Sequence, residues 1–264
     1  MRISFCSSNS VLRTCSQKQF QYYIDPYIGH QSSFAYFTNS NCSKTSWNDE
    51  IKIQRDICTK LQKELDEIEP QTILIGYKTD PYQVLEESLC QTRIVLEVLL
   101  EKGFSVNINT KSNLVKRDFD ILKKMPASKV CLSVASNDDK INELFDFNTL
   151  NKKNRNQALR EIKAEGVKTS LKIGPIIPKI SDPKAIVSEV QHITDDIELH
   201  ALSFNDKRGE DWIRFEEILY KNYLESAEEI ETIIFSKDHV YWLKLRAELE
   251  VYISNKNLNF SLKF

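Results

Sequence analysis

The chain has 264 residues, of which 41% are hydrophobic and 28% are charged, and its formal net charge is −2. These are the values of an ordinary globular protein, and they argue against a general attraction to polyanions, although a local basic patch stays compatible with them. An α/β barrel uses this length as one unit, so we expect a single domain over residues 1–264.

Glycine and cysteine usage argues against two further classes of protein. Only six glycines occur, roughly a third of the usual frequency, and no glycine-rich phosphate loop can be built from them. The six cysteines form no CxxC pair, and the first residues, MRISFCSSNSVLRTC, lack the apolar core of a secretory signal. No apolar run is long enough to span a membrane. We therefore expect reduced thiols, a cytoplasmic location and no membrane association.

The N-terminal part changes character near residue 47. Residues 1–46 are rich in Ser, Asn, Gln and Tyr without a sustained period, which predicts a loop-rich segment with a short strand at 20–24. The following stretch, SWNDEIKIQRDICTKLQKELDEIEP, has a serine cap, early acids and apolar residues Ile57, Leu61 and Leu65 at a spacing of four. It predicts one amphipathic helix that ends before Pro70.

Short apolar runs then alternate with helical patterns. Strands are predicted at 72–77, 104–110, 129–136, 168–178 and 197–203, and helices at 83–102, 114–125, 153–165 and 183–192. Five strand–helix units in this rhythm indicate a parallel sheet with right-handed helical crossovers, which we assign to a β/α core over 47–205. Ligands of such folds bind at the carboxyl ends of the strands.

The last part of the chain, 206–264, follows another pattern. Helices are predicted at 209–225 and 237–255, and LNFSLKF at the end predicts a strand. We expect these elements to cap the sheet instead of forming a second domain.

Four strand-end sequences carry a family resemblance. IGYKTDPYQ, NINTKSNLVKRDFDIL, LSVAS and LKIGPIIPKISD occur in this order and at spacings that resemble the radical S-adenosylmethionine (radical SAM) superfamily, in the branch related to spore photoproduct lyase. The resemblance covers roughly residues 10–205. It implies a partial (β/α)6 barrel of the TIM type, which agrees with the strand–helix pattern.

In that family the loop after the first strand reads approximately Asn-Pro-Tyr-x-Gly-Cys-x-x-x-Cys-x-Tyr-Cys. The resemblance implies that its three cysteines hold a [4Fe-4S] cluster, which binds SAM and generates a 5′-deoxyadenosyl radical. The present chain keeps the frame as DPYIGHQSSFAYF, but the three cysteine positions hold His30, Phe34 and Phe37. The cysteine that spore photoproduct lyases carry after the second strand is also absent from the turn Tyr77–Asp80.

These replacements predict that the cluster is lost. A phenyl ring has no lone pair to offer iron, and one imidazole does not replace three thiolates. We expect a non-catalytic pseudoenzyme with neither SAM nor a [4Fe-4S] cluster as cofactor. An alternative stays open in which His30 and Cys42 are substitute ligands; the chain would then be a radical SAM-type enzyme acting on nucleic acid, with both cofactors.

The resemblance also implies a vestigial SAM pocket. Lys111 and Ser133 lie where the family contacts the SAM carboxylate and ribose, Thr79 and Asp80 border the same mouth, and Tyr36 keeps the aromatic ring beside the adenine. The alternative for Thr79 and Asp80 is a purely local role in turns and helix caps. Phe34 and Phe37 would fill the volume that the cluster vacates.

Two basic stretches raise a nucleic-acid role. KKNRNQALREIK and LKKMPASK contain Lys152, Lys153, Arg155, Arg160, Lys163, Lys123, Lys124 and Lys129. Such clusters meet phosphates, but they are equally typical of solvated helix faces. Our favoured hypothesis is a non-catalytic binding or regulatory module with a protein partner, and the further alternative is a non-catalytic nucleic-acid or nucleotide-binding protein.

Overall fold

The structure is a computed structural model that describes residues 2–8, 10–29, 50–145, 150–204, 206–236, 238–256 and 258–264. The loop positions 30, 34, 36 and 37, on which the cluster argument depends, lie outside these ranges. Within the described ranges, no helix is both long enough and apolar enough to cross a membrane.

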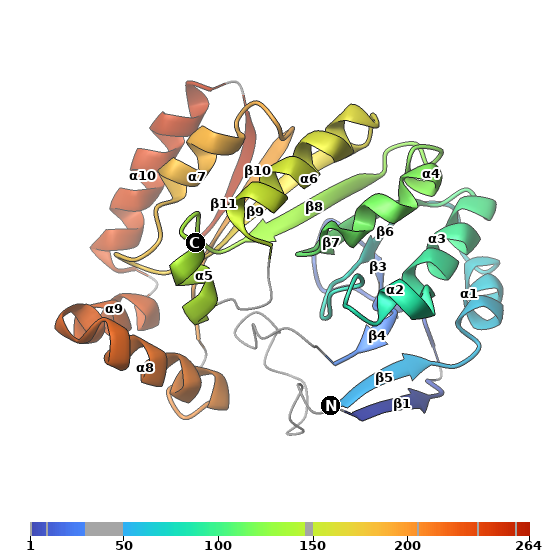
Figure 1. Ribbon diagram of the computed structural model, residues 1–264, viewed down its shortest axis with the longest axis horizontal. Coiled ribbons are helices and arrows are strands. Elements are labelled where there is room, and N and C mark those ends of the chain that lie inside the picture. Colours follow the sequence, from blue (N-terminus) through green and yellow to red (C-terminus); the bar gives the residue numbers. More distant parts are fainter. Residues whose placement is uncertain are drawn as a thin grey trace.

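An eight-stranded sheet forms the centre of the molecule (Figure 1). Its order is β11-β10-β9-β8-β7-β6-β3-β2, and every pairing is parallel except that of β2 with β3. The strands are β2 (Arg13–Thr14), β3 (Tyr22–Ile24), β6 (Thr72–Ile75), β7 (Ser105–Thr110), β8 (Lys129–Val134), β9 (Lys168–Ile176), β10 (Asp196–Ala201) and β11 (Asn259–Lys263). The predicted α/β class with a mostly parallel sheet is confirmed.

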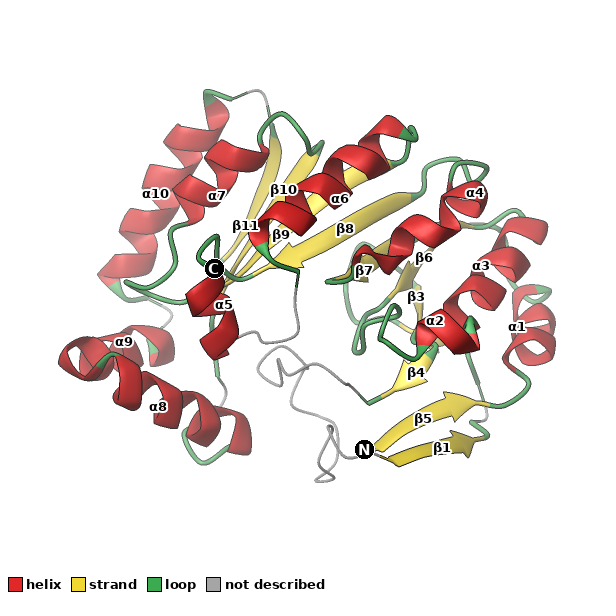
Figure 2. Ribbon diagram, viewed as in Figure 1, coloured by secondary structure: helices red, strands yellow, loops and turns green. Residues whose placement is uncertain are grey.

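Helices connect the strands and cover the sheet (Figure 2). They are α1 (Ile57–Leu65), α2 (Glu86–Leu89), α3 (Gln91–Glu101), a 3-10 turn (Asn113–Asp118) leading into α4 (Phe119–Leu122), α5 (Asp139–Phe145), α6 (Lys152–Ala164), α7 (Pro183–Val190), α8 (Glu210–Asn222), α9 (Leu224–Phe235) and α10 (Val240–Ser254). The long helix predicted at 83–102 is broken into α2 and α3 at Cys90, which has a positive φ of 51°.

The two faces of the sheet differ in polarity. Successive side chains of a strand point to opposite faces, so each strand contributes one row to each side. One face is apolar and packs with the crossover helices in the main core; its rows include Val106, Ile108, Val130, Leu132, Leu171, Ile173, Ile197 and Leu199. The opposite rows are polar and consist of Asn107, Asn109, Cys131, Ser133, Ser170, Lys172, Glu198 and His200. A sheet that buries one face and keeps the other polar has room for a polar ligand on that second face.

The single helix predicted from residue 46 to Pro70 is wrong in its first part. Residues Glu50–Gln54 form β5, which pairs in parallel with β1 (Arg2–Cys6) and antiparallel with β4 (Tyr27–Ile28). Ile51 and Ile53 are buried while the residue between them is exposed, which is the period of a strand. The helix begins only at Ile57.

The C-terminal segment contains more helix than its sequence pattern indicated. Helix α9 was not predicted, and with α8 it lies beside α5 (Figure 1) around a second core. Trp212 and Phe215 of α8 pack there with Phe145, the last residue of α5. The final strand, β11, pairs with β10 and therefore extends the main sheet.

Candidate functional site

A polar pocket lies at the carboxyl ends of β6, β7 and β8 and reaches the middle of β9. Its volume is about 110 Å³, and its lining consists of Gln17, Gly76, Tyr77, Lys78, Thr79, Asp80, Asn109, Thr110, Lys111, Ser133, Lys172 and Gly174. Four of the residues predicted for a SAM pocket, Thr79, Asp80, Lys111 and Ser133, are brought together here. The fifth, Tyr36, lies outside the described residues. The pocket lies at the carboxyl ends of parallel strands, where ligands of such sheets bind.

Asp80 ties two strand ends together instead of pointing freely into the pocket. Its Oδ1 accepts hydrogen bonds from the Tyr82 amide at 2.8 Å and the Thr110 hydroxyl at 2.7 Å. Its Oδ2 accepts from the Lys111 amide at 2.7 Å. Thr79 is buried, with 4% of its surface exposed, and its hydroxyl donates to the carbonyl of Tyr27 at 2.6 Å. Both side chains thus hold distant segments of the chain together, and only the bond from the Tyr82 amide to Asp80 is of the turn type.

Lysines dominate the charge of the pocket. Lys78, Lys111 and Lys172 contribute to its lining, whereas Asp80 is the only acidic residue among the lining residues that the structure describes. Lys172 was not predicted, although it lies opposite Ser133 in the strand register, so the alternating pattern of β9 could have identified it. The arrangement favours a ligand with a carboxylate or phosphate group.

Acid–base side chains flank Lys172 on the next strand. Glu198 is its register partner on β10, and Glu198 Oε2 lies 3.3 Å from His200 Nε2. The hydrogen bond with His200 lowers the pKa of Glu198, and burial lowers the pKa of His200. Near neutral pH this pair therefore holds a carboxylate beside an imidazole that burial keeps neutral.

Two glycines permit close approach between strands at the pocket. Gly76 has φ +81°, and a Cβ there would lie 2.3 Å from the carbonyl oxygen of Asn109 and 2.7 Å from Cδ of Pro81. A Cβ at Gly174 would lie 2.9 Å from both Cβ and the carbonyl oxygen of His200. Larger residues would push neighbouring backbone apart, so both positions require glycine.

The first residues of the DPYIG segment are anchored to the turn after β6. The buried carboxylate of Asp25 accepts hydrogen bonds from the amides of Tyr77 at 2.9 Å and Lys78 at 3.2 Å. Further along, the side-chain amide of Gln83 donates to the carbonyl of Gly29 at 2.9 Å. With the bond from Thr79 to Tyr27, these contacts hold the segment from 25 to 29 against the turn after β6.

A cluster of buried carboxylates and arginines holds Tyr27, which belongs to the same segment. The hydroxyl of Tyr27 donates to Glu86 Oε2 at 2.5 Å, and Arg117 Nη2 donates to Glu86 Oε1 at 2.5 Å. Arg117 Nε also donates to Asp118 Oδ1 at 2.9 Å, and Arg93 Nη1 donates to the same oxygen at 2.9 Å. Glu86 and Asp118 are both 0% exposed, so each buried carboxylate needs these donors.

The tyrosines of the cluster stay protonated as donors. Burial, with the hydrogen bond to Glu86, raises the pKa of Tyr27 far above its ordinary value. Burial likewise raises the pKa of Tyr82, whose hydroxyl donates to Asp118 Oδ2 at 3.0 Å. Both hydroxyls therefore stay protonated near neutral pH and serve as donors.

The donor side chains of the site bear on whether it could hold a metal. In the ranges that the structure describes, no group of three or more His, Cys, Asp and Glu side chains is placed to hold a metal ion. The loop positions 30, 34 and 37 lie outside those ranges, and in the sequence they supply one imidazole and two phenyl rings. This donor set does not fit an iron–sulfur cluster, which is held by thiolates.

Solved structures share this arrangement of strands. A spore photoproduct lyase double mutant with bound AdoMet and dinucleoside spore photoproduct matches with a TM-score of 0.68 at 13% sequence identity, over 99% of this chain and 81% of that one. The chain has the fold of spore photoproduct lyase. Streptococcus suis SuiB bound to S-adenosylmethionine matches with a TM-score of 0.59 at 14% identity, over 92% of this chain and 50% of that one. The radical SAM fold expected from the strand-end sequences is thereby confirmed.

Sequence relatives do not add an activity to the fold. The uncharacterized protein MJ0683 of Methanocaldococcus jannaschii is 30% identical over 157 residues, which are 59% of this chain and 58% of that protein. The uncharacterized protein Rv2578c of Mycobacterium tuberculosis is 24% identical over 144 residues, 52% of this chain and 42% of that protein. The chain thus matches about half the length of these curated relatives, and no family model matches it.

The buried Asp25 makes the stability of this fold depend on pH. Burial raises the pKa of Asp25 from 3.8 to about 6, against the lowering effect of the backbone amides that it accepts from. Its contribution to the free energy of unfolding is therefore complete below pH about 4 and is lost as the pH rises through about 6. The loss amounts to about 3 kcal/mol, from the difference between the two pKa values.

Asp25→Asn tests this dependence. Asparagine, the residue of the family pattern at this position, keeps an acceptor for the amides but does not ionise. We expect the stability of the variant relative to the parent to rise by about 3 kcal/mol between pH 4 and pH 7, as measured by urea unfolding at several pH values. If the free energy of unfolding changed with pH in the same way in the parent and in Asp25→Asn, ionisation of Asp25 would not destabilise the fold and the prediction would be wrong.

Proposed function

We propose that the chain is a cluster-free protein of the radical SAM fold that binds a small ligand through a carboxylate or phosphate group and catalyses no radical reaction. The observation that carries this proposal is that one loop keeps the family's frame residues but not its cysteines. The frame residues from Asp25 to Gly29 are held in place by protein contacts, while His30, Phe34 and Phe37 stand at the positions where the family has thiolates. The described start of the loop, residues 25–29, thus has protein partners of its own.

The lysine-lined pocket supplies the binding role. Lys111 and Lys172 approach it from β7 and β9, and Ser133 lies between them on β8. Spore photoproduct lyase and SuiB have been solved with AdoMet or S-adenosylmethionine bound. We therefore propose SAM or a related nucleotide as the ligand, held through its carboxylate or phosphate by lysine and without coordination to iron.

The contacts of the basic stretches favour the pocket over a nucleic-acid surface. Arg155 is 2% exposed and therefore buried. Lys152 pairs with Glu189 at 2.5 Å and Lys163 with Asp195 at 3.0 Å. Lys123 and Lys129 pair in the same way, with Glu165 at 3.6 Å and Asp196 at 3.3 Å. Lysines that are already paired offer less charge to a phosphate backbone. A separate protein partner stays a prediction from the sequence.

Anaerobic reconstitution with iron and sulfide tests the cluster-free part of the proposal. We expect the parent chain to bind no stoichiometric iron, because it lacks the thiolates. The variant His30→Cys/Phe34→Cys/Phe37→Cys restores the family pattern on the same frame and serves as the positive control, with iron and visible thiolate-to-iron absorption. Stoichiometric iron and sulfide in the parent chain would contradict the proposal and favour the enzyme that uses His30 and Cys42.

Calorimetric titration with SAM and ATP tests the binding part. We expect binding to the parent chain, weakened roughly tenfold by Lys111→Met or Lys172→Met, since a hydrogen bond to a charged group contributes about 1.5–3 kcal/mol. Lys168→Met is the matched control, because Lys168 is exposed at the opposite end of β9. Absence of heat for both ligands at low salt, or equal weakening by the control, would contradict this role of the pocket.

A further inference from the structure

Helix α10 is apolar on two sides, and only one of them is covered by the described chain. Trp242, Leu249 and Ile253 are buried in the main core. On the other side, Leu243 is 60% exposed and Val251 is 67% exposed. A row of exposed apolar side chains on a surface helix is a candidate contact surface.

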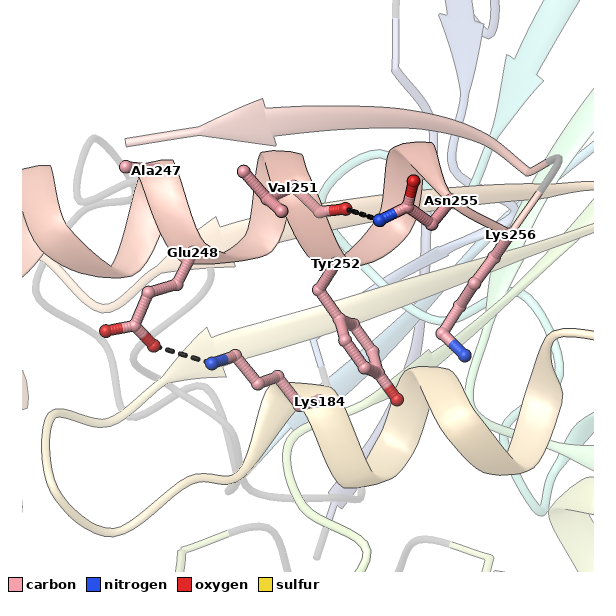
Figure 3. Close-up of a pocket in the computed structure, with 7 residues that line it drawn as sticks. All are labelled: Lys184, Ala247, Glu248, Val251, Tyr252, Asn255 and Lys256. Atoms are coloured by element: carbon pink, nitrogen blue, oxygen red, sulfur yellow. Dashed lines mark hydrogen bonds and ion pairs between the residues drawn. The ribbon is translucent and has the colours of Figure 1, made fainter.

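The exposed apolar residues form one stripe along the helix. Val240, Leu243, Ala247 and Val251 follow one another at spacings of three, four and four, which places them on a single face. Figure 3 shows Ala247 and Val251 on the outer side of α10, while Glu248 and Tyr252 reach toward α7. We call these four residues the α10 stripe. The open groove that borders it between α7 and α10 has a volume of about 650 Å³.

Charged residues flank the α10 stripe at equal intervals before and after Ala247, with positive charges before it and negative charges after it. Lys244 and Arg246 precede Ala247 by three residues and one, and Glu250 and Glu248 follow it by the same intervals. On the α7 side of the stripe lie Lys244 and Glu248, the latter paired with Lys184 of α7 at 2.6 Å. On the other side lie Arg246 and Glu250, with the Arg246 guanidinium 5.6 Å from the ring centre of Phe264.

We propose that the α10 stripe binds the same stripe of a second copy of this chain, as an antiparallel helix pair related by a two-fold axis at Ala247. Such an axis places Leu243 opposite Val251 of the second copy, and the small Ala247 lets the helices approach closely. On one flank each Lys244 then meets Glu248 of the second copy. On the other flank each Arg246 meets Glu250 of the second copy.

The charge pattern selects this occupant and this orientation. A parallel pair would bring Lys244 next to Lys244 and Glu248 next to Glu248, which is unfavourable. In the antiparallel pair the two-fold axis repeats every attractive contact twice. One helix face is smaller than the area of about 1,200–2,000 Å² that stable interfaces bury, so the dimer should be reversible and depend on concentration.

Analytical ultracentrifugation of the whole chain tests the proposal, beginning with the apolar contact. We expect a monomer–dimer equilibrium that Leu243→Arg abolishes. Leu224→Arg is the matched control, because Leu224 is 71% exposed on another helix, α9, and its replacement should leave the equilibrium unchanged. A monomer at every concentration, or equal loss of dimer in both variants, would overturn the proposal.

A charge-swap experiment then tests the pairing itself. Lys244→Glu and Glu248→Lys, each alone, place like charges across the axis, and we expect each to weaken the dimer about tenfold. When the two variants are mixed, with one of them fluorescently labelled, both contacts of the mixed pair become attractive and a heterodimer should form as tightly as the parent dimer. If a substitution weakened the dimer only by disturbing the fold of its own chain, mixing the two variants would not restore dimerisation. Failure of the mixture to form heterodimer would overturn the pairing.

Discussion

The guanidinium of Arg117 is the contact on which the candidate site depends, because it neutralises two carboxylates that have no access to solvent. Its bonds to Glu86 and Asp118 join the helices after β6 to the 3-10 turn after β7. Glu86 in turn accepts from Tyr27, which carries the interaction into the loop where the family binds its cluster. Loss of the arginine would leave buried, unpaired charge, which is costly. Residues 25–29, the described start of that loop, are therefore held by contacts within the protein.

The polarity of the sheet explains on which of its faces the pocket lies. Its apolar face belongs to the core, and its polar face presents Ser133, Lys172 and Glu198 in adjacent register. These side chains do not depend on the cluster loop, since β8, β9 and β10 position them.

The fold was largely predictable from the sequence, with a few exceptions. Strand β6 is a short apolar run, and β7 to β10 carry apolar residues at alternate positions between turn residues, so local pattern identified them. The strand β5 was missed because its identity depends on pairing with β1, which is distant in sequence. In the site, the family resemblance located Thr79, Asp80, Lys111 and Ser133, whereas Lys172 comes from the strand register and was missed. The roles of Tyr36, His30, Phe34 and Phe37 rest on the sequence alone, since these residues lie outside the described ranges.

Amide hydrogen exchange at Tyr77 and Lys78 tests most directly whether the loop frame stands without iron. Both amides donate to the buried Asp25, so they report on the anchor itself. In protein treated with a chelator, the account predicts that they exchange as slowly as the central strand amide of Ile108. Rapid exchange in the metal-free protein, with protection that returns only when iron and sulfide are supplied, would contradict it.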